Sequence, residues 1–178
     1  MGKFNILVLA LAMAGASTVA SAAEGSGVYL RGEVGNSTLH VDGDSAVDTA
    51  MNGWLGYSFN SLIGVEAHYG SLGKDSDQGS TIEMNATGIG LRLKHEFAGG
   101  MYYVAGRAGM ERIESEFTDG DFGIQLTEEE DNPYAGLGMG YNVNKNFAVT
   151  GYWDTRTVPF FFGDERVDTL TIGGEYRF

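Results

Sequence analysis

The alternation of apolar and polar residues is the feature of this chain that most limits its fold. The last ten residues, TLTIGGEYRF, separate at alternating positions into an apolar set and a polar set: Leu170, Ile172, Tyr176 and Phe178 against Thr169, Thr171, Glu175 and Arg177. A period of two residues predicts a β-strand with one apolar and one polar face. In a soluble sandwich the apolar face would point inward, whereas in a membrane barrel it would point to lipid.

Seven earlier segments show the same alternation, at 28–34, 53–59, 63–69, 88–94, 102–111, 134–141 and 147–154. Short connections near Asn60, near Gly99 and over 142–146 take turns with hydrophilic ones over 38–49, 72–81, 114–132 and 157–166, which we expect to be long loops. Outer-membrane barrels sort short and long connections to opposite rims. The sequence therefore predicts an all-β fold, an eight-stranded antiparallel up-and-down transmembrane β-barrel.

The first 22 residues have the composition of a secretory signal peptide. Lys3 precedes an apolar stretch over 6–19, and Ala20-Ser21-Ala22 offers small residues for cleavage. A membrane anchor is the alternative, but the apolar run is short for a bilayer span. We expect a cleaved signal over 1–22 and a barrel domain over 23–178. The absence of cysteine excludes disulfides and thiolate chemistry.

The two predicted faces carry different side chains. The apolar face has aromatic residues near strand ends, which fits girdles at the membrane interfaces: Tyr57, Phe59, Tyr69, Phe97, Tyr102, Tyr141, Phe147, Tyr176 and Phe178. The other face has five acids and five bases: Arg31, Glu33, Glu66, Arg92, Lys94, Arg107, Glu111, Asp154, Glu175 and Arg177. These charges would suit the outside of a soluble sandwich, but their many glycine neighbours favour a crowded lumen, where equal numbers permit pairing.

Three stretches carry a resemblance to a known family: NPYAGLGMGYNVNKNFAV (132–149), GYSFNSLIGVEAHYG (56–70) and the terminal GGEYRF. They resemble the small outer-membrane β-barrel superfamily that includes the OmpA transmembrane domain, OmpX, Ail and the opacity-type proteins. The resemblance covers nearly all of the chain after the signal. It implies a Gram-negative outer membrane, periplasmic N- and C-termini, contact with outer-membrane lipid and lipopolysaccharide, and a terminal Phe178 that the barrel-assembly machinery reads.

The resemblance also implies a gating role for the lumen charges. OmpA-like barrels carry a gating salt-bridge network, and Glu66 would belong to it, with Arg92, Lys94 and Arg107 as candidate partners. The alternative is interior packing that satisfies the charges and fixes strand register. The expected function is a structural or surface-interaction, adhesin-like role; a small gated porin is the alternative.

The long hydrophilic connections carry most of the acidic surplus. Removing Lys3 with the signal lowers the formal charge from −13 to −14, which disfavours nucleic-acid binding. These acids could bind divalent cations or remain a solvated surface, and no specific metal or cofactor site is expected. Phe160, Phe161 and Phe162 are either a patch for a host or envelope ligand or outer girdle residues.

An enzymatic role would require a histidine and a serine placed together on the lipid face, as in some small barrels that modify lipid A. We expect His40 in a loop, His68 in the lumen and His95 near the periplasmic rim. None of them has a serine at a suitable spacing on the outer face. The sequence therefore predicts a protein that is not an enzyme.

Overall fold

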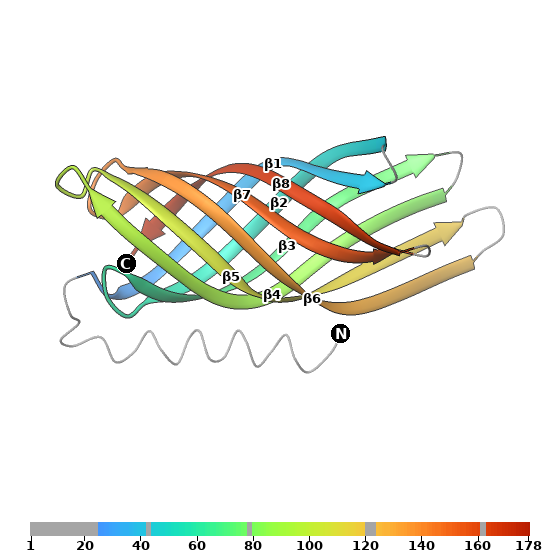
Figure 1. Ribbon diagram of the computed structural model, residues 1–178, viewed down its shortest axis with the longest axis horizontal. Helices are drawn as coiled ribbons and strands as arrows, with labels where there is room; N and C mark the ends of the chain where they lie inside the picture. Colours follow the sequence, from blue (N-terminus) through green and yellow to red (C-terminus); the bar gives the residue numbers. More distant parts are fainter. Residues whose placement is uncertain (1–24, 42–43, 78–79, 120–123, 161–162) are drawn as a thin grey trace.

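The computed structural model describes residues 25–41, 44–77, 80–119, 124–160 and 163–178; the expected signal peptide lies outside these ranges. Eight strands form a closed barrel in which each strand pairs antiparallel with the next and the first pairs with the last (Figure 1). This confirms the predicted fold. Within the described ranges, no helix has the length and apolar character to cross a membrane. The strands are β1 (Gly27–Val41), β2 (Asp44–Ser58), β3 (Ile63–Asp77), β4 (Ser80–Phe97), β5 (Tyr102–Asp119), β6 (Ile124–Asn142), β7 (Phe147–Phe160) and β8 (Gly163–Arg177).

The apolar side chains of the middle of each strand point outward. Leu137 and Leu170 are each 65% exposed, whereas their neighbours Gly136 and Thr169 face the interior. An outward apolar surface over a polar interior is the arrangement of a membrane barrel and the reverse of a soluble one. We use the name apolar belt for these exposed outer residues: Leu30, Val34, Met51, Val65, Tyr69, Ile89, Leu91, Leu93, Val104, Met110, Leu137, Met139, Val149, Trp153, Leu170 and Ile172.

The near end of the barrel, where Gly27 and Arg177 lie, has three tight connections at the predicted positions. The side-chain oxygen of Asn60 accepts backbone N–H groups of Leu62 and Ile63, and Asn144 does the same for Asn146 and Phe147. Such turns are a common use of asparagine. In the third turn, Ala98-Gly99-Gly100, all three residues have positive φ, which glycine tolerates best.

Most of the predicted aromatic girdle lies at the near end, and its rings touch one another. Tyr102 packs against Phe97 and Tyr141, with ring centroids 6.0 and 5.4 Å away, and Tyr176 packs against Phe178 at 5.1 Å. Phe178 is 71% exposed and donates its backbone N–H to Val28. Tyr69, on β3, is the member of the predicted set that lies toward the opposite end.

The prediction of four long loops at the far end, opposite the near end, is wrong. The segments 38–49, 72–81, 114–132 and 157–166 consist mostly of paired strand, so that β5 and β6 remain in register from Tyr102–Tyr141 to Asp119–Ile124. His40, expected in a loop, lies on β1 opposite Ser45. The hydrophilic composition of these segments therefore reflects exposure to water on the outer face rather than a lack of backbone pairing.

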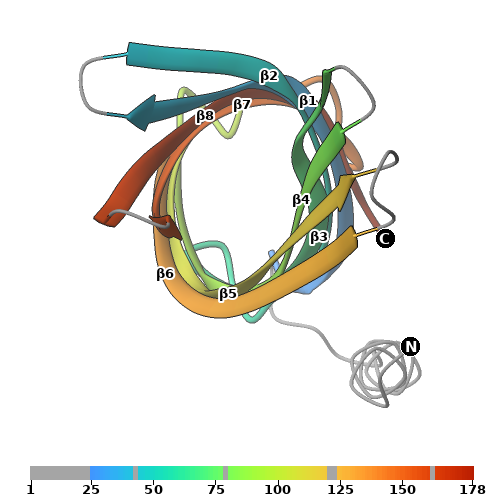
Figure 2. The same ribbon diagram turned by 90° about the vertical axis from the view of Figure 1, so that its right-hand side faces the viewer.

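The strands separate into two sheets as they approach the far end (Figure 2). Among the described residues, β2 pairs with β3 only from Met51 to Ser58, and β6 pairs with β7 only from Tyr134 to Asn142. The other strand pairs continue. Pro133, which has no backbone N–H to donate, stands where the β6–β7 pairing stops. One sheet contains β7, β8, β1 and β2, and the other contains β3 to β6.

Candidate functional site: the charged lumen

The ten charged residues of the predicted inner face all project into the barrel. Eight are at most 5% exposed, and Lys94 and Arg177, near the near-end rim, are partly exposed. Charges removed from water in this way are costly unless they are paired and hydrogen-bonded. The pairing pattern therefore decides what the lumen can do.

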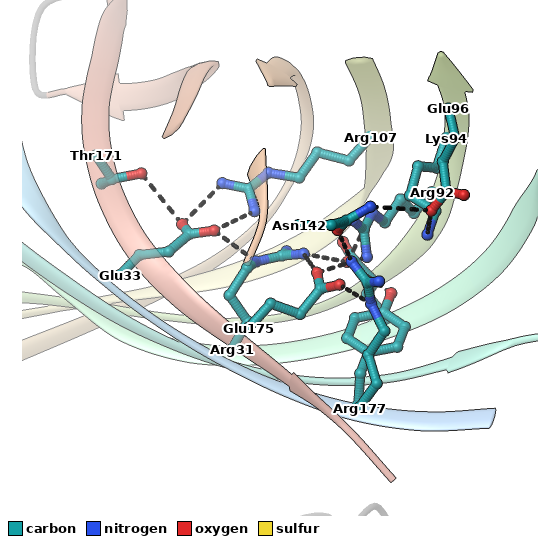
Figure 3. Close-up of polar contacts among 12 residues, drawn as sticks. Arg31, Glu33, Arg92, Lys94, Glu96, Arg107, Asn142, Thr171, Glu175 and Arg177 are labelled. Carbon is teal, nitrogen blue, oxygen red and sulfur yellow. Dashed lines mark hydrogen bonds and ion pairs between the residues drawn. The ribbon is translucent and has the colours of Figure 1, made fainter. Parts of the chain in front are cut away.

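Arg107 of β5 is the centre of one part of the network. Its guanidinium binds Glu33 of β1 through two nitrogens, at 2.9 and 3.0 Å, and Asp154 of β7 through Nε and Nη2, at 2.6 and 2.5 Å. Thr171 of β8 donates its hydroxyl to Glu33 at 3.2 Å (Figure 3). The fork geometry of arginine suits two carboxylates at once. This group ties opposite walls of the barrel together.

Arg31 of β1 connects the ion pairs around Arg107 to a second cluster of ion pairs, which lies nearer the chain termini. Its Nε binds Glu33 at 2.7 Å, and its Nη1 lies 2.9 Å from Glu66 and 3.3 Å from Glu175. Arg92 reaches Glu175 at 2.8 Å but Glu66 only at 3.9 Å. Three carboxylates from three strands thus share one guanidinium.

The closest partners of Glu66 therefore differ from those that the sequence suggested. Arg31 and the Tyr29 hydroxyl, which donates at 2.7 Å, are its close contacts. Of the candidate partners, Arg92 is at 3.9 Å, Arg107 binds other acids, and Lys94 binds Glu96 at 2.8 Å. Spacing along single strands could not reveal this, because the pairing depends on barrel tilt and side-chain reach.

The near-end rim completes the network with groups that contact solvent. Arg177 binds Glu175 at 2.8 Å and donates to the Asn142 side chain at 2.8 Å, and Asn142 in turn donates to the Gly100 carbonyl. Lys94 and Glu96 lie beside this group in Figure 3. Because Glu175 also binds Arg31 and Arg92, the chain of contacts runs without interruption from the rim to the middle of the lumen.

Aromatic rings lie between the guanidinium groups, an arrangement that the sequence analysis did not predict. Arg107 lies 3.9 Å from the centroids of both Trp54 and Tyr152, and Arg31 lies 4.6 Å from Tyr152. An arginine over an aromatic face is favourable, most of all where water is excluded. The inward position of Trp54 was readable from its alternation with Leu55, but its stacking role was not.

A third group lies toward the far end. His68 Nε2 is 3.1 Å from Glu111, and Arg156 Nε is 3.2 Å from the other oxygen of Glu111. The His68 ring packs against Trp54 at 4.3 Å and Tyr134 at 5.1 Å. Arg156 is missing from the predicted set because that prediction ended the strand at Asp154; two further residues of alternation would have placed it inside.

Several buried polar atoms of the lumen have no partner within the described part of the chain. They include Arg31 Nη2, Glu66 Oε2, Arg92 Nη2 and the hydroxyls of Tyr103 and Tyr152. Buried groups of this kind generally bind water when space permits. The network therefore has spare donors and acceptors around a filled interior.

The remaining predicted positions lie elsewhere. Phe160 ends β7, nothing is described of its side chain, and Phe161 and Phe162 lie outside the described residues. His40 contacts Asp168 at 3.3 Å near the far end, and His95 is exposed on the outer face near the near end. Among the residues described, no group of three or more histidine and acidic side chains could hold a metal ion.

Exposed acids lie on β5 and β6 at the far end: Glu114, Glu129 and Asp131 are on the outer face, and Glu130, opposite Ile113, is on the other face. Arg112 binds Asp131 at 2.8 Å and Glu129 at 3.7 Å. Exposed ion pairs of this kind stabilise little. Their contribution is to surface charge rather than to the fold.

The geometry agrees with what this chain is similar to. A family model described as "Outer membrane protein beta-barrel domain" matches residues 6–178. No curated protein sequence matches the chain. Among solved structures, Neisserial surface protein A is 14% identical with a TM-score of 0.75, over 87% of this chain and 100% of that one.

Two further structures share the fold. Ail of Yersinia pestis, in complex with the heparin analogue sucrose octasulfate, is 16% identical with a TM-score of 0.66, over 86% of this chain and 99% of that one. The N-terminal barrel domain of Pseudomonas aeruginosa OprF is 15% identical with a TM-score of 0.59, over 85% and 99%. At these identities the likeness extends to the fold alone.

Proposed function

This chain belongs to the family of outer membrane proteins with a β-barrel domain, and from that premise we propose that it is a closed barrel with a surface-interaction role. The main support is a contrast between two parts of the barrel. Paired charges fill the lumen. Beyond the apolar belt, the strands continue as two separate sheets whose strands remain paired and which carry exposed acids. A filled lumen favours a role outside the barrel, and a rigid projection provides a surface for it.

The tight turns at the near end support an orientation. In outer-membrane barrels the short connections face the periplasm, so we place the termini there and the far end at the cell surface. A cleaved signal over 1–22 would deliver the chain to this location. Lipopolysaccharide would then surround the outer leaflet half of the apolar belt, in reach of Arg112 and Arg166, which are exposed on β5 and β8.

The charge of the far end selects the class of partner. Ail was crystallised with a sulfated, polyanionic ligand, whereas the exposed far-end side chains Glu114, Glu129, Glu130 and Asp131 would repel one. The unpaired edges of the sheets, at β6 in particular, can add an extended segment by backbone hydrogen bonding. We therefore propose a cationic protein segment on a host or envelope surface as the partner.

A binding measurement on the refolded barrel in nanodiscs tests this role. We expect a fluorescent decalysine peptide to bind in a salt-dependent manner and fluorescent heparin not to bind. A variant with Glu129, Glu130 and Asp131 replaced by their amides should lose decalysine binding, whereas neutralising the near-end residue Glu96 should not. Equal binding by both variants, or preferential binding of heparin, would contradict the proposal.

A gated pore is the second candidate, favoured by the unpartnered Glu66 Oε2 and Arg92 Nη2 atoms of the lumen. Such atoms allow alternative ion pairs, which could open a water path. Single-channel recording in planar bilayers, with Glu66→Ala beside the unmodified protein, separates the candidates. Discrete steps changed by the substitution would establish the pore; silence from protein whose folding is confirmed by heat-dependent gel mobility supports the closed barrel. No catalytic role is proposed.

A further inference from the structure

The polarity of the barrel reverses along its strands. On β5, Met110 points outward at 52% exposure and Glu111 points into the lumen. Two residues further, the exposed residue is charged, Arg112, and the buried one is apolar, Ile113 at 3%. The outer surface thus changes from lipid-compatible to water-compatible at the same step at which the interior changes from charged to apolar.

The opposite wall shows the same reversal. On β8, Leu170 is exposed and Thr169 is buried, whereas nearer the far end Arg166 is exposed and Val167 is 1% exposed. A fold with an apolar interior and a charged exterior is that of a water-soluble protein. The far-end parts of β5 and β8 therefore have the construction of a soluble β-structure that continues from a membrane barrel.

The buried apolar residues of this part touch one another across the lumen. Leu72, Ala86, Ile113 and Val167 form one cluster, against which Leu39 and Met84 pack. We call these six residues the apolar seal. β4 and β8 face each other across an eight-stranded barrel, as do β5 and β1, so contacts among these strands bridge the full width of the lumen.

A bulge in β3 supplies one member of the seal. The β3–β4 register shifts between Ser71 and Gly73, which leaves Leu72 as the extra residue. Bulges re-aim side chains, and Leu72 is 1% exposed as a result. A side chain added at Gly73 would meet Asp48 of β2, so the position after the bulge is also tightly packed.

We infer that the lumen has a second, independent closure, the apolar seal. It lies inside the barrel, nearer the far end than the apolar belt, and excludes water from the far-end side of the charge network. Hydrophobic constrictions block water and ions by dewetting rather than by steric contact alone. The inference does not rest on the surface-binding role proposed above. A pore through this barrel would have to open two closures of different chemistry, the charge network and the apolar seal. Rearranging the Glu66 contacts alone would therefore open no path from the far end.

Thiol modification tests the seal, because the chain has no cysteine of its own. Thr169 is 0% exposed and is the next inward-facing residue of β8 after Val167, toward the near end. Thr169→Cys therefore reports on water access to the near-end side of the seal. The reagent is a small cationic methanethiosulfonate added to the barrel in nanodiscs. Thr49→Cys, exposed on β2, is the accessible reference.

We expect Thr169→Cys to react roughly 100-fold more slowly than Thr49→Cys, since modification of a buried thiol requires local opening. Adding Leu72→Ser and Ile113→Ser should bring its rate close to the reference, and Ile113→Ala alone should give an intermediate rate with less risk to folding. Val47→Ser, an apolar loss on the exposed outer face of β2, should change nothing. Rapid labelling with the seal intact, or slow labelling in a folded Ile113→Ala or Leu72→Ser/Ile113→Ser barrel, would overturn the inference.

Discussion

Arg107 lies over the indole ring of Trp54 inside the barrel, with 3.9 Å between the guanidinium carbon and the centroid of the ring. The guanidinium carbon of Arg107 also lies 3.9 Å from the ring centroid of Tyr152. The donors of Arg107 bind Glu33 and Asp154. One side chain therefore joins two carboxylates and two rings, from β1, β2 and β7, to β5.

Replacing Arg107 by alanine should destabilise the barrel strongly. The change leaves Glu33 and Asp154 buried with fewer counter-charges, and breaking a buried pair from one side costs roughly 3–5 kcal/mol. The free energy of unfolding in urea, measured on the barrel folded in lipid vesicles, checks this value. Arg112→Ala is the matched control, because it also removes a bidentate contact to an aspartate, but on the exposed surface; it should change stability far less. An equal loss in the two variants would contradict the role assigned to burial.

Close contact between glycines and lumen rings gives a second prediction. A Cβ placed at Gly138 of β6 would overlap the ring of Tyr152, and one at Gly56 would overlap the ring of Tyr29. Because both rings are almost fully buried, they cannot move aside freely. Gly138→Ala should lower the free energy of unfolding by about 1–3 kcal/mol, as expected for an overpacked interior.

Gly32→Ala is the control for that substitution. Gly32 lies on the outer face of β1, and a Cβ there meets nothing within 4 Å. Its alanine variant should unfold at nearly the same urea concentration as the unmodified barrel. If Gly32→Ala and Gly138→Ala lower the midpoint equally, ring contact at Gly138 would not be the cause of the loss, because the reduced freedom of the unfolded chain by itself would raise the midpoint in both.

The sequence predicted the topology, the near-end turns and the inward direction of ten charged lumen residues, though not of Arg156, because each of these follows from local alternation or from turn residues such as Asn60 and Gly99. It did not predict the closest partners of Glu66, Arg31 and Tyr29 of β1; of the candidates on β4 and β5, Arg92 forms a longer ion pair with it, at 3.9 Å. It also failed at the far end. From Met110 to Ile113 the two-residue period continues, but the apolar residues change from the outer face to the inner face. A strand defined by apolar residues on its outer face therefore ends too early, and the rest of it is predicted as a loop.

Phe178 provides a prediction that separates assembly from stability. Its side chain is 71% exposed and touches Tyr176, so its loss removes little packing from the folded barrel. If the assembly machinery reads this residue, Phe178→Ala should reduce the amount of folded barrel in the outer membrane of expressing cells. The same variant refolded in detergent should unfold at an almost unchanged urea concentration.

Phe97→Ala is the control for the assembly prediction, since Phe97 is another half-exposed near-end aromatic, 46% exposed. It should assemble in cells as the unmodified protein does. A folded fraction in cells that is equally reduced for both variants would assign the effect to the girdle and not to the terminal position.

The continuation of β5 and β6 beyond the apolar belt can be tested by cross-linking. Glu114 and Glu129 are directly opposite in the register, and opposite residues of antiparallel strands have Cα atoms about 4.5–5.5 Å apart, within the range that a disulfide spans. The double variant Glu114→Cys/Glu129→Cys should therefore oxidise to an intramolecular disulfide, seen as loss of free thiol in the folded protein by mass spectrometry. Glu114→Cys/Glu130→Cys, one residue out of register and on opposite faces, should oxidise much more slowly. Equal rates for the two pairs would mean that this segment samples many registers, as a loop does. That result would support the loop over 114–132 that its hydrophilic composition predicts.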